Sequence, residues 1–443
     1  MRMRAESRVA LAVCLLVFGL GANGLAAQTP APASSPLPVI HTDNGVNSAA
    51  ARAAHYVVLV SLDGFRWDYA RRDGAEHLLA LGKHGVWAPD GMLPSFPSLT
   101  FPNHYTLVTG LYPEHHGIVA NSFYDASRQG RYAMSDSAAV QDGSWYGGTP
   151  LWSLAESQGM RAACLFWVGS EAQIAGYRPT YTLKFDDKID VHARIQQVAD
   201  WLALPEDVRP HLIAIYFSEP DHEGHMFGPD AAETRDAVRR MDGLVGELKA
   251  VLDATKLPID LVVVSDHGMV HEQGNWINLD QFADLSNFEA VGPLLYPKSE
   301  ADAEHAYDAL KKASSQFVVY RRKNVPANLH YNENPREGDP VVIPTGPYPI
   351  RAHGPAADKP DRAPTAGMHG FDPHTMPEMK ASFFAAGPDI VAGKTVRTFE
   401  NVNLYPWIAH LLGLKAPKTD GSLSVLAGTL RDGGGPELKG DKE

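Results

Sequence analysis

The sequence predicts an α/β protein built around a mostly parallel, doubly wound sheet with helices on both faces. Short, nearly continuous apolar runs recur at residues 55–62, 210–217, 259–265 and 381–387. Such runs are typical of strands that helices cover on both faces. An amphipathic segment at 231–254 lies between two of them, with apolar residues at helical spacing. Strands that alternate with helices favour a parallel sheet.

Length and charge limit the class of protein. The chain has 443 residues, of which 44% are hydrophobic, so it can bury a large core in one domain with an insertion or in two domains. The formal net charge of −13 argues against a protein that coats the phosphates of nucleic acids. A small anionic substrate would need a local cation to offset this charge.

The amino terminus has the three parts of a secretory signal peptide. Arginines at positions 2, 4 and 8 precede an apolar run and a small-residue stretch that ends at Ala27. The apolar run is short for a membrane span, so we expect cleavage after residues 1–27, export to a bacterial periplasm or beyond, and no stable membrane insertion. An uncleaved anchor is the alternative. Cleavage would leave Cys164 as the only cysteine, which fits a periplasm better than a disulfide-stapled extracellular module.

Composition divides the remaining chain into a main domain and its flanks. Residues 28–54 are rich in Pro, Ala and Ser and predict a flexible lead-in. The main domain is expected at 55–428, with a loop-rich insertion at about 275–367 that is dense in Pro, Asn and Gly over 325–367. The polar, Gly-rich tail at 429–443 predicts disorder.

Acidic residues follow three of the predicted strands. Asp63 follows the first, Asp221 and His225 follow the second, and Asp266 and His267 follow the third. In open α/β sheets, ligands bind beyond the carboxyl ends of the strands. One such Asp would more often be a helix cap or a turn residue, but three of them, two with a nearby His, favour a binding site.

Carboxylates mixed with imidazoles favour zinc, whereas magnesium and calcium prefer oxygen ligands alone. Asp221 and His225 are four residues apart, which suits one helical face or one loop wall, although exposed pairs at this spacing are common. His369, in GMHGFD, is a further candidate ligand, although a single loop histidine is more often a surface residue.

Thr100 is the candidate nucleophile. It lies in PSFPSLTFPNHYTL, ahead of an apolar run that predicts a helix starting near Asn103. Unpaired N–H groups at a helix amino terminus form a natural cradle for phosphate oxygens. The alternative is that Thr100 is only an N-cap, which is the commoner role of a Thr in such a place. A metal within bonding distance would help this hydroxyl lose its proton.

Several segments carry a more specific resemblance. They are LDGFRWDY, LTFPNHYTLVTGLYPEHHGIVANSFYD, EPDHEGHMFGP, VVVSDHGM, LHYNENPREGD and GMHGFD. Together they resemble, in the same order, the motifs of the nucleotide pyrophosphatase/phosphodiesterase family of the alkaline phosphatase superfamily. They extend from about residue 55 to 415. The resemblance implies an alkaline-phosphatase-like sheet that holds two zinc ions.

The resemblance also implies a role for each matching residue. The implied ligands of one zinc are Asp221, His225 and His369, and those of the other are Asp63, Asp266 and His267. Thr100 would bridge to the second zinc and act as the nucleophile, and Asn121 would donate to a phosphoryl oxygen. His104, His115, His116 and His222 lie near these motifs, and we give them no catalytic role. Val168 stands where many relatives have Pro, which puts that pocket wall in doubt.

The expected reaction is hydrolysis of nucleotide diesters and pyrophosphates to nucleoside monophosphates through a phosphorylated threonine. Phe101 and Tyr216 match family positions that flank a nucleobase, and Tyr181 is a third candidate, with core packing as the alternative for both tyrosines. Hydrolysis of phospholipid headgroup diesters or of phosphate monoesters is an alternative with the same metals. A sulfatase is disfavoured because Cys164 lacks the required context. A non-catalytic exported zinc-binding protein is the remaining alternative.

Overall fold

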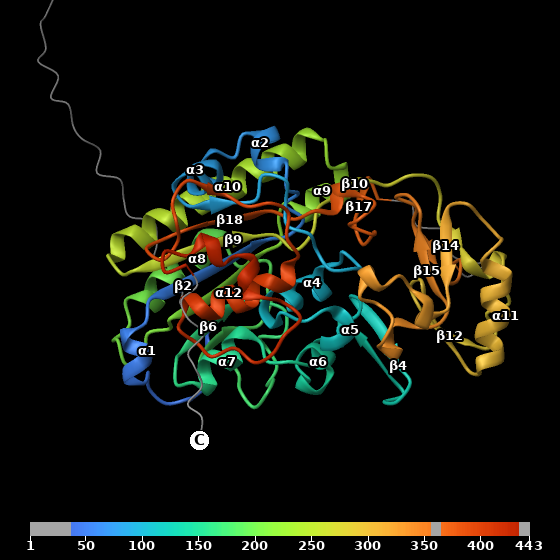
Figure 1. Cartoon of the computed structure of the whole chain (residues 1–443), viewed down its shortest axis with the longest axis horizontal. Helices are drawn as coiled ribbons and strands as arrows, with labels where there is room; N and C mark the ends of the chain where they lie inside the picture. The colour runs from blue at the N-terminus through green and yellow to red at the C-terminus, as the bar shows by residue number, and fades with distance from the viewer. Residues whose placement is uncertain (1–36, 356–364, 434–443) are drawn as a thin grey trace, which may run out of the picture. The chain divides into compact units, whose positions relative to one another are not determined.

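The structure is a computed structural model, and it describes residues 37–355 and 365–433. The predicted signal peptide lies outside the described residues. Within them, nine strands form one central sheet (Figure 1). Their order across the sheet is β1 (Ile40–His41), β7 (Tyr181–Leu183), β6 (Ala162–Leu165), β8 (Leu212–Phe217), β2 (Tyr56–Leu62), β9 (Ile259–Val264), β18 (Phe383–Ala386), β3 (Val86–Trp87) and β19 (Lys394–Thr395).

The middle of the sheet is parallel, as predicted. The neighbours β7, β6, β8, β2 and β9 all run in the same direction. The run predicted at 381–387 forms β18, which is antiparallel to both β9 and β3. The sheet is therefore mixed at this side, and the carboxyl ends of β8, β2 and β9 meet at one edge.

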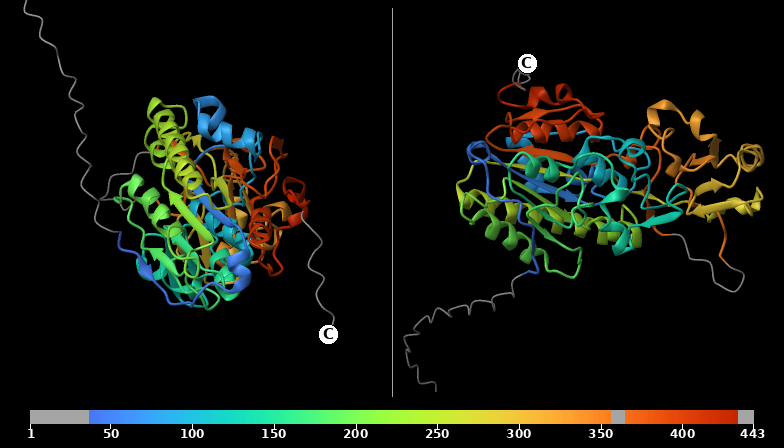
Figure 2. Two further views of the ribbon diagram at one scale, coloured as in Figure 1. Left: turned by 90° about the vertical axis from the view of Figure 1, so that its left-hand side faces the viewer. Right: turned by 90° about the horizontal axis from the view of Figure 1, so that it is seen from below.

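Helices cover both faces of the sheet, which confirms the doubly wound prediction (Figures 1 and 2). In β2, Val58 and Val60 belong to one core cluster, whereas Val57 and Leu59 belong to the other. This alternation follows from the two-residue period of a strand. The first cluster packs against α3 (Glu76–His84), α8 (Val191–Leu202) and α10 (Ala232–Thr255), and the second packs against α4 (Thr100–Thr109), α7 (Leu151–Ser157) and α12 (Leu404–Leu411).

The sheet domain also contains shorter helices and paired strands. The helices are α2 (Tyr69–Asp73), α5 (Pro113–His116), α6 (Ser137–Val140) and α9 (Asp221–Phe227), and the paired strands are β4 (Ser122–Asp125) with β5 (Gly130–Ala133) and β10 (Val270–His271) with β17 (Gly367–Met368).

The predicted insertion contains more regular structure than its composition indicated. Residues 277–352, here named the lobe, have a hydrophobic cluster of their own that includes Leu295, Leu310 and Phe317. Short apolar runs in a Pro-rich and Gly-rich background form its hairpins. Its elements are β11 (Ile277–Asn278), β12 (Phe288–Val291), β13 (Leu294–Pro297), α11 (Glu300–Leu310), β14 (Phe317–Tyr320), β15 (Val341–Pro344) and β16 (Ile350–Arg351).

Residues 37–54, predicted as part of a flexible lead-in, instead form β1 and α1 (Ala49–Ala53). β1 extends the central sheet at its edge by pairing with β7. The buried Asn47 donates hydrogen bonds to the carbonyl oxygens of Glu206 and Arg209, both at 2.8 Å. These contacts fix a segment whose composition alone favours disorder. The predicted tail also starts later than expected, because Leu430 is buried and bridges to Ile390.

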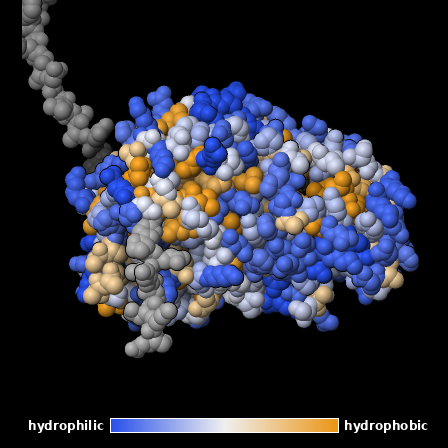
Figure 3. Space-filling model, viewed as in Figure 1, coloured by the Kyte–Doolittle hydropathy of each residue, from blue (hydrophilic) through white to orange (hydrophobic). Residues whose placement is uncertain are grey.

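Across residues 37–355 and 365–433, no helix is both long and apolar enough to cross a membrane. On the face shown in Figure 3, hydrophobic residues form small groups surrounded by hydrophilic ones.

Candidate active site

The acidic residues that follow three neighbouring strands lie together at the carboxyl edge of the sheet. Asp63 comes directly after β2, Asp266 and His267 come shortly after β9, and Asp221 begins α9 after β8. The backbone ties these ends together, because Gly64 N–H donates to Asp266 Oδ1 at 3.1 Å. The fold thus gathers side chains from distant parts of the sequence, as expected at this edge.

One group consists of Asp221, His225 and His369. Asp221 and His225 share a face of α9, and His225 Nε2 lies 3.4 Å from Asp221 Oδ2. His369 follows β17 and places its Nε2 3.1 Å from His225 Nε2 and 3.7 Å from Asp221 Oδ1. Their ligand atoms all lie within 4.8 Å of one another. The structure thus brings together the first predicted ligand set.

The second predicted set, Asp63, Asp266 and His267, is buried beside the first. His267 Nε2 lies 3.0 Å from Asp266 Oδ2 and 3.5 Å from Asp63 Oδ1. Asp221 belongs with both sets, because its ligand atom also lies within 4.8 Å of those of Asp63 and His267.

Backbone acceptors fix the tautomers of His225, His267 and His369. Each donates from Nδ1 to a carbonyl oxygen, and these oxygens belong to Gly367, Gly268 and Ser98, at 2.8, 3.0 and 2.9 Å respectively. A carbonyl oxygen can only accept, so each Nδ1 atom carries a proton and each Nε2 atom is the ring nitrogen that could bind a metal. Histidine ligands of metals are commonly oriented by such a second hydrogen bond.

The carboxylates, like the histidines, are arranged as ligands of a cation would be. Asp63 Oδ1, Asp221 Oδ1 and Asp266 Oδ2 are buried and have no hydrogen-bond partner among the described residues. Burial, with the charges of Asp266 and Asp221, raises the pKa of Asp63 well above its usual value. Burial and the neighbouring His267 and His225 lower the pKa of His369 well below its usual value. Crowded carboxylates beside three imidazoles whose Nε2 atoms face them are a donor set that divalent cations would stabilise.

Thr100 lies at the edge of this donor set. Its Oγ1 is 3.3 Å from His267 Nε2. Thr100 is the first residue of α4, and Leu99 occupies the N-cap position. The N-cap alternative for Thr100 is therefore wrong, and so is the prediction that the helix starts near Asn103. The half-buried hydroxyl stands where the first N–H groups of the helix have no intrahelical partner.

Asn121 is positioned by the amino terminus of the same helix. Its Oδ1 accepts a hydrogen bond from Phe101 N–H at 2.9 Å. The amide oxygen is thereby engaged, which leaves the Nδ2 group as the donor available to a ligand. Asn121 therefore stands next to Thr100 with the polarity that the resemblance implied.

His104 contributes to the site, although we gave it no catalytic role on sequence grounds. It is fully buried, with Nδ1 at 2.9 Å from Thr100 O and 3.3 Å from Asp266 Oδ2, while Nε2 lies 2.8 Å from Ser61 Oγ. It thus links the nucleophile candidate to a candidate ligand. The spacing of four residues from Thr100 on one helix was the signal that could have identified it.

A cavity of about 570 Å³, here named the Phe101 pocket, opens beside Thr100 and Asp63. Phe101 and Tyr216, the two residues predicted to flank a nucleobase, both line it, and the Tyr216 hydroxyl donates to Asp63 Oδ2 at 2.7 Å. Phe166, Trp167 and Phe185 are aromatic lining residues that the sequence did not single out, and Val168 also lies on the wall.

Tyr181, the third predicted substrate contact, is not among the residues that line the Phe101 pocket. It lies in β7, its hydroxyl donates to Val208 O at 3.0 Å, and its ring packs near Trp201. Core packing, the alternative for this tyrosine, is therefore what the structure shows.

The sheet and the gathered carboxylates and imidazoles define a metal-dependent hydrolase of α/β fold. The family model of type I phosphodiesterase/nucleotide pyrophosphatase matches residues 57–372. An uncharacterized pyrophosphatase/phosphodiesterase of Schizosaccharomyces pombe is 34% identical over 391 residues, which are 83% of this chain and 78% of that protein. The mouse ectonucleotide pyrophosphatase/phosphodiesterase family member 7 is 33% identical over 409 residues, or 88% and 90% of the two chains.

Solved structures agree with these sequence matches. Murine ectonucleotide pyrophosphatase/phosphodiesterase 5, in an inactive threonine-to-alanine form in complex with AMP, superimposes with a TM-score of 0.77 at 29% identity. The match covers 85% of this chain and 100% of that one. The chain belongs to the nucleotide pyrophosphatase/phosphodiesterase family and is an enzyme of that family, as the motifs predicted.

Proposed function

We propose that this enzyme hydrolyses phosphodiester and pyrophosphate bonds of small nucleotides to nucleoside monophosphates through a phosphorylated Thr100. The single observation that carries the proposal is the position of Thr100 Oγ1, between a dense carboxylate and imidazole group and an aromatic pocket. The inactive form of the murine relative with bound AMP supports a nucleoside monophosphate as the retained product.

The chain's own groups suit a two-step reaction. Thr100 Oγ1 attacks the phosphorus and gives up its proton to solvent, while the bond to the leaving oxygen breaks and that oxygen takes up a proton from water. Water then attacks the phosphothreonine, which releases the nucleoside monophosphate and restores the hydroxyl. Asn121 Nδ2–H donates to a phosphoryl oxygen during both steps. Phe101 N–H is bound to Asn121 and Pro102 has no N–H, so the backbone N–H of Thr100 is the group at the start of α4 that would donate to the same phosphoryl group.

Two zinc ions are the proposed cofactors. Asp221, His225 and His369 would hold one, and Asp63, Asp266 and His267 would hold the other beside Thr100. Bound cations would supply positive charge against the phosphoryl oxygens and favour the ionised threonine hydroxyl. His104 Nδ1 lies beside both the carbonyl oxygen of Thr100 and Asp266 Oδ2, and its Nε2 contacts Ser61 Oγ, so His104 would help to hold Asp266 and the backbone of Thr100 in position.

The Phe101 pocket would take the nucleoside. Phe101 and Tyr216 offer aromatic faces, and base stacking on such faces contributes about 1–3 kcal/mol per base. The volume of about 570 Å³ lies within the usual range for small-molecule sites, which is roughly 300–1,000 Å³.

The substrate class is tested with three esters that share a p-nitrophenol leaving group. They are the AMP diester, the phosphate monoester and the phosphocholine diester. We expect the highest kcat/KM for the AMP diester. A preference for the monoester or for the phosphocholine diester would contradict the proposal and support one of the two alternatives.

We also propose that the enzyme acts outside the cytoplasm, because the amino terminus has the pattern of a signal peptide. Fractionation of cells that express the full chain, with amino-terminal sequencing of the exported form, tests this. A start near residue 28 is expected, whereas an intact amino terminus in the cytoplasm would contradict it.

A further inference from the structure

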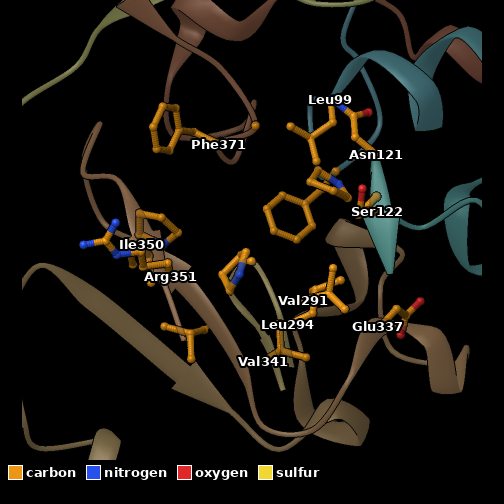
Figure 4. A pocket seen from close by; sticks show the side chains of 18 of the residues that line it. Leu99, Asn121, Ser122, Val291, Leu294, Glu337, Val341, Ile350, Arg351 and Phe371 are labelled. Atoms are coloured by element: carbon orange, nitrogen blue, oxygen red, sulfur yellow. The ribbon is translucent and has the colours of Figure 1, made fainter. Parts of the chain in front are cut away.

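A second cavity, of about 420 Å³, lies between the sheet domain and the lobe and borders the site. We name it the lobe pocket. Asn121 and His369 line it, whereas Thr100 and Phe101 line the Phe101 pocket instead. The two cavities therefore border the donor set through different residues. Figure 4 shows Leu99, Asn121 and Phe371 of the domain across the hollow from Val291, Leu294 and Val341 of the lobe.

The wall of the lobe pocket is mostly hydrocarbon and aromatic ring. Its apolar members include Phe96, Trp276, Val291, Leu294, Tyr348, Ile350 and Phe371. Trp276, Val291, Leu294 and Tyr348 are only half-buried, so their side chains offer apolar surface to whatever enters. An apolar hollow with a few polar groups at one end is the usual form of a small-molecule site.

The charged residues on this wall do not offset its apolar character. Glu337 is fully buried, and burial together with the nearby Glu114 raises its pKa to about 9, so it is uncharged at neutral pH. Arg351 is engaged, because its Nε donates to Asn278 Oδ1 and its guanidinium lies over the Trp276 ring at 5.0 Å. A pyrophosphate leaving group would bring several negative charges to this wall.

The assignment of the two pockets rests on the proposed function and follows from how a diester would lie across Thr100. The attacking and leaving oxygens of a phosphoryl transfer are roughly in line, so the leaving group points away from Thr100 Oγ1. With the retained nucleoside in the Phe101 pocket, the other ester substituent lies on the side of Asn121 and His369. We propose that the lobe pocket binds this leaving group and selects diesters whose leaving alcohol is uncharged and apolar.

The test compares the methyl and n-hexyl esters of AMP. Both leaving groups are simple primary alkoxides, so a difference reports mainly on binding of the chain. Burial of each methylene is worth about a two- to fourfold gain. The hexyl ester should therefore have a kcat/KM at least about tenfold above that of the methyl ester. Equal values for the two esters would overturn the proposal.

Two variants test whether the preference for the hexyl ester arises in the lobe pocket. Val291→Asn puts a polar amide on the wall, whereas Val318→Asn makes the same change at an exposed position of β14 in the same lobe. We expect Val291→Asn to lower the ratio of hexyl to methyl kcat/KM and Val318→Asn to preserve it. A ratio that Val291→Asn leaves at the wild-type value would overturn the proposal.

Binding of the two esters to the Thr100→Ala variant tests the lobe pocket independently of catalysis. Calorimetric titration of this variant should give the hexyl ester a dissociation constant at least about tenfold below that of the methyl ester. Equal dissociation constants would overturn the lobe-pocket assignment. If wild-type protein hydrolyses neither ester nor any other AMP diester, the proposed function fails, while this titration still decides the pocket.

Discussion

Two groups of aspartate and histidine lie at opposite ends of the same sheet. At the carboxyl ends of β2 and β9 stands the site with Asp63, Asp266 and His267. At the other end, His55 precedes β2, Asp260 lies near the start of β9, and Asp389 follows β18. The ligand atoms of this second group also lie within 4.8 Å of one another.

The two groups differ in how their side chains are held. His55 Nδ1 contacts Asp389 Oδ2 directly at 2.6 Å, and both side chains are more than one third exposed. Asp260 alone is fully buried, and burial together with the charge of Asp389 raises its pKa to about 7. At this end a proton can neutralise the buried carboxylate. At the other end, backbone carbonyls turn three imidazole lone pairs toward several carboxylates.

Residue types alone therefore do not distinguish the two groups. Both groups contain the donors that zinc prefers, but only one combines oriented imidazoles with a neighbouring hydroxyl and a pocket.

The largest expected effect is that of Thr100→Ala, which removes the proposed nucleophile from the carboxyl end of the sheet. We expect kcat/KM for an AMP diester to fall by at least about 10³-fold, because no other group replaces the attacking oxygen. Steady-state kinetics measures this, and elemental analysis should show that most of the metal remains bound. Activity within tenfold of the wild type would remove Thr100 from the mechanism.

A matched pair of histidine variants tests which end of the sheet holds metal. His369→Ala should lower the bound transition metal and reduce kcat/KM by about 10²-fold or more, because one oriented lone pair is lost. His55→Ala should change neither quantity, since His55 is half-exposed and distant in the fold from Thr100. Metal loss from His55→Ala, with none from His369→Ala, would reverse the comparison.

Phe101→Ala should weaken binding of the nucleoside half of the substrate. Loss of one stacking face corresponds to about a five- to 150-fold rise in KM for an AMP diester. Phe101→Tyr, which keeps the aromatic face, is the control and should stay close to the wild type. An unchanged KM in the alanine variant would place the nucleoside outside the Phe101 pocket.

The smallest effect concerns stability at the second end of the sheet. Because the folded pKa of Asp260 is about 7 and the unfolded value is near the usual one, only the folded state holds this proton at intermediate pH. Wild-type stability is thus fully present at low pH and falls as pH rises through about 7.

Asp260→Asn removes that pH dependence while keeping an acceptor for Asp389 N–H. Its Tm should be closest to the wild type below about pH 4, exceed it increasingly as the pH rises to about 7, and keep a constant difference above that pH. Thermal unfolding at a series of pH values, in the presence of a chelator, measures the difference. Parallel Tm profiles for the two proteins would show that Asp260 does not titrate in this window.

The sequence predicted the strands and helices that lead to the carboxyl end of the sheet well, because both impose simple periods. The apolar run at 259–265 became β9, and the amphipathic segment at 231–254 became α10, each within one residue of the predicted bounds. Strand ends in a parallel sheet share an edge, so placing Asp63 and Asp266 together needed only the strand order near β2.

Other features depended on tertiary contacts that composition does not reveal. Asn47 fixes the amino-terminal segment through partners more than 150 residues away, and Pro and Ala content alone favoured disorder there. His104 gained its role only when α4 placed it against Asp266. The lobe pocket is formed by residues that are distant in sequence, and no short pattern marks them.

We propose that the carboxyl edge of the sheet holds two transition-metal ions beside Thr100. Anomalous diffraction from crystals of the purified enzyme, recorded on both sides of the zinc absorption edge, tests it most directly. We predict one peak among Asp221, His225 and His369 and a second among Asp63, Asp266 and His267. A fully active enzyme with no peak there, or with its only peak at His55, Asp260 and Asp389, would contradict the claim.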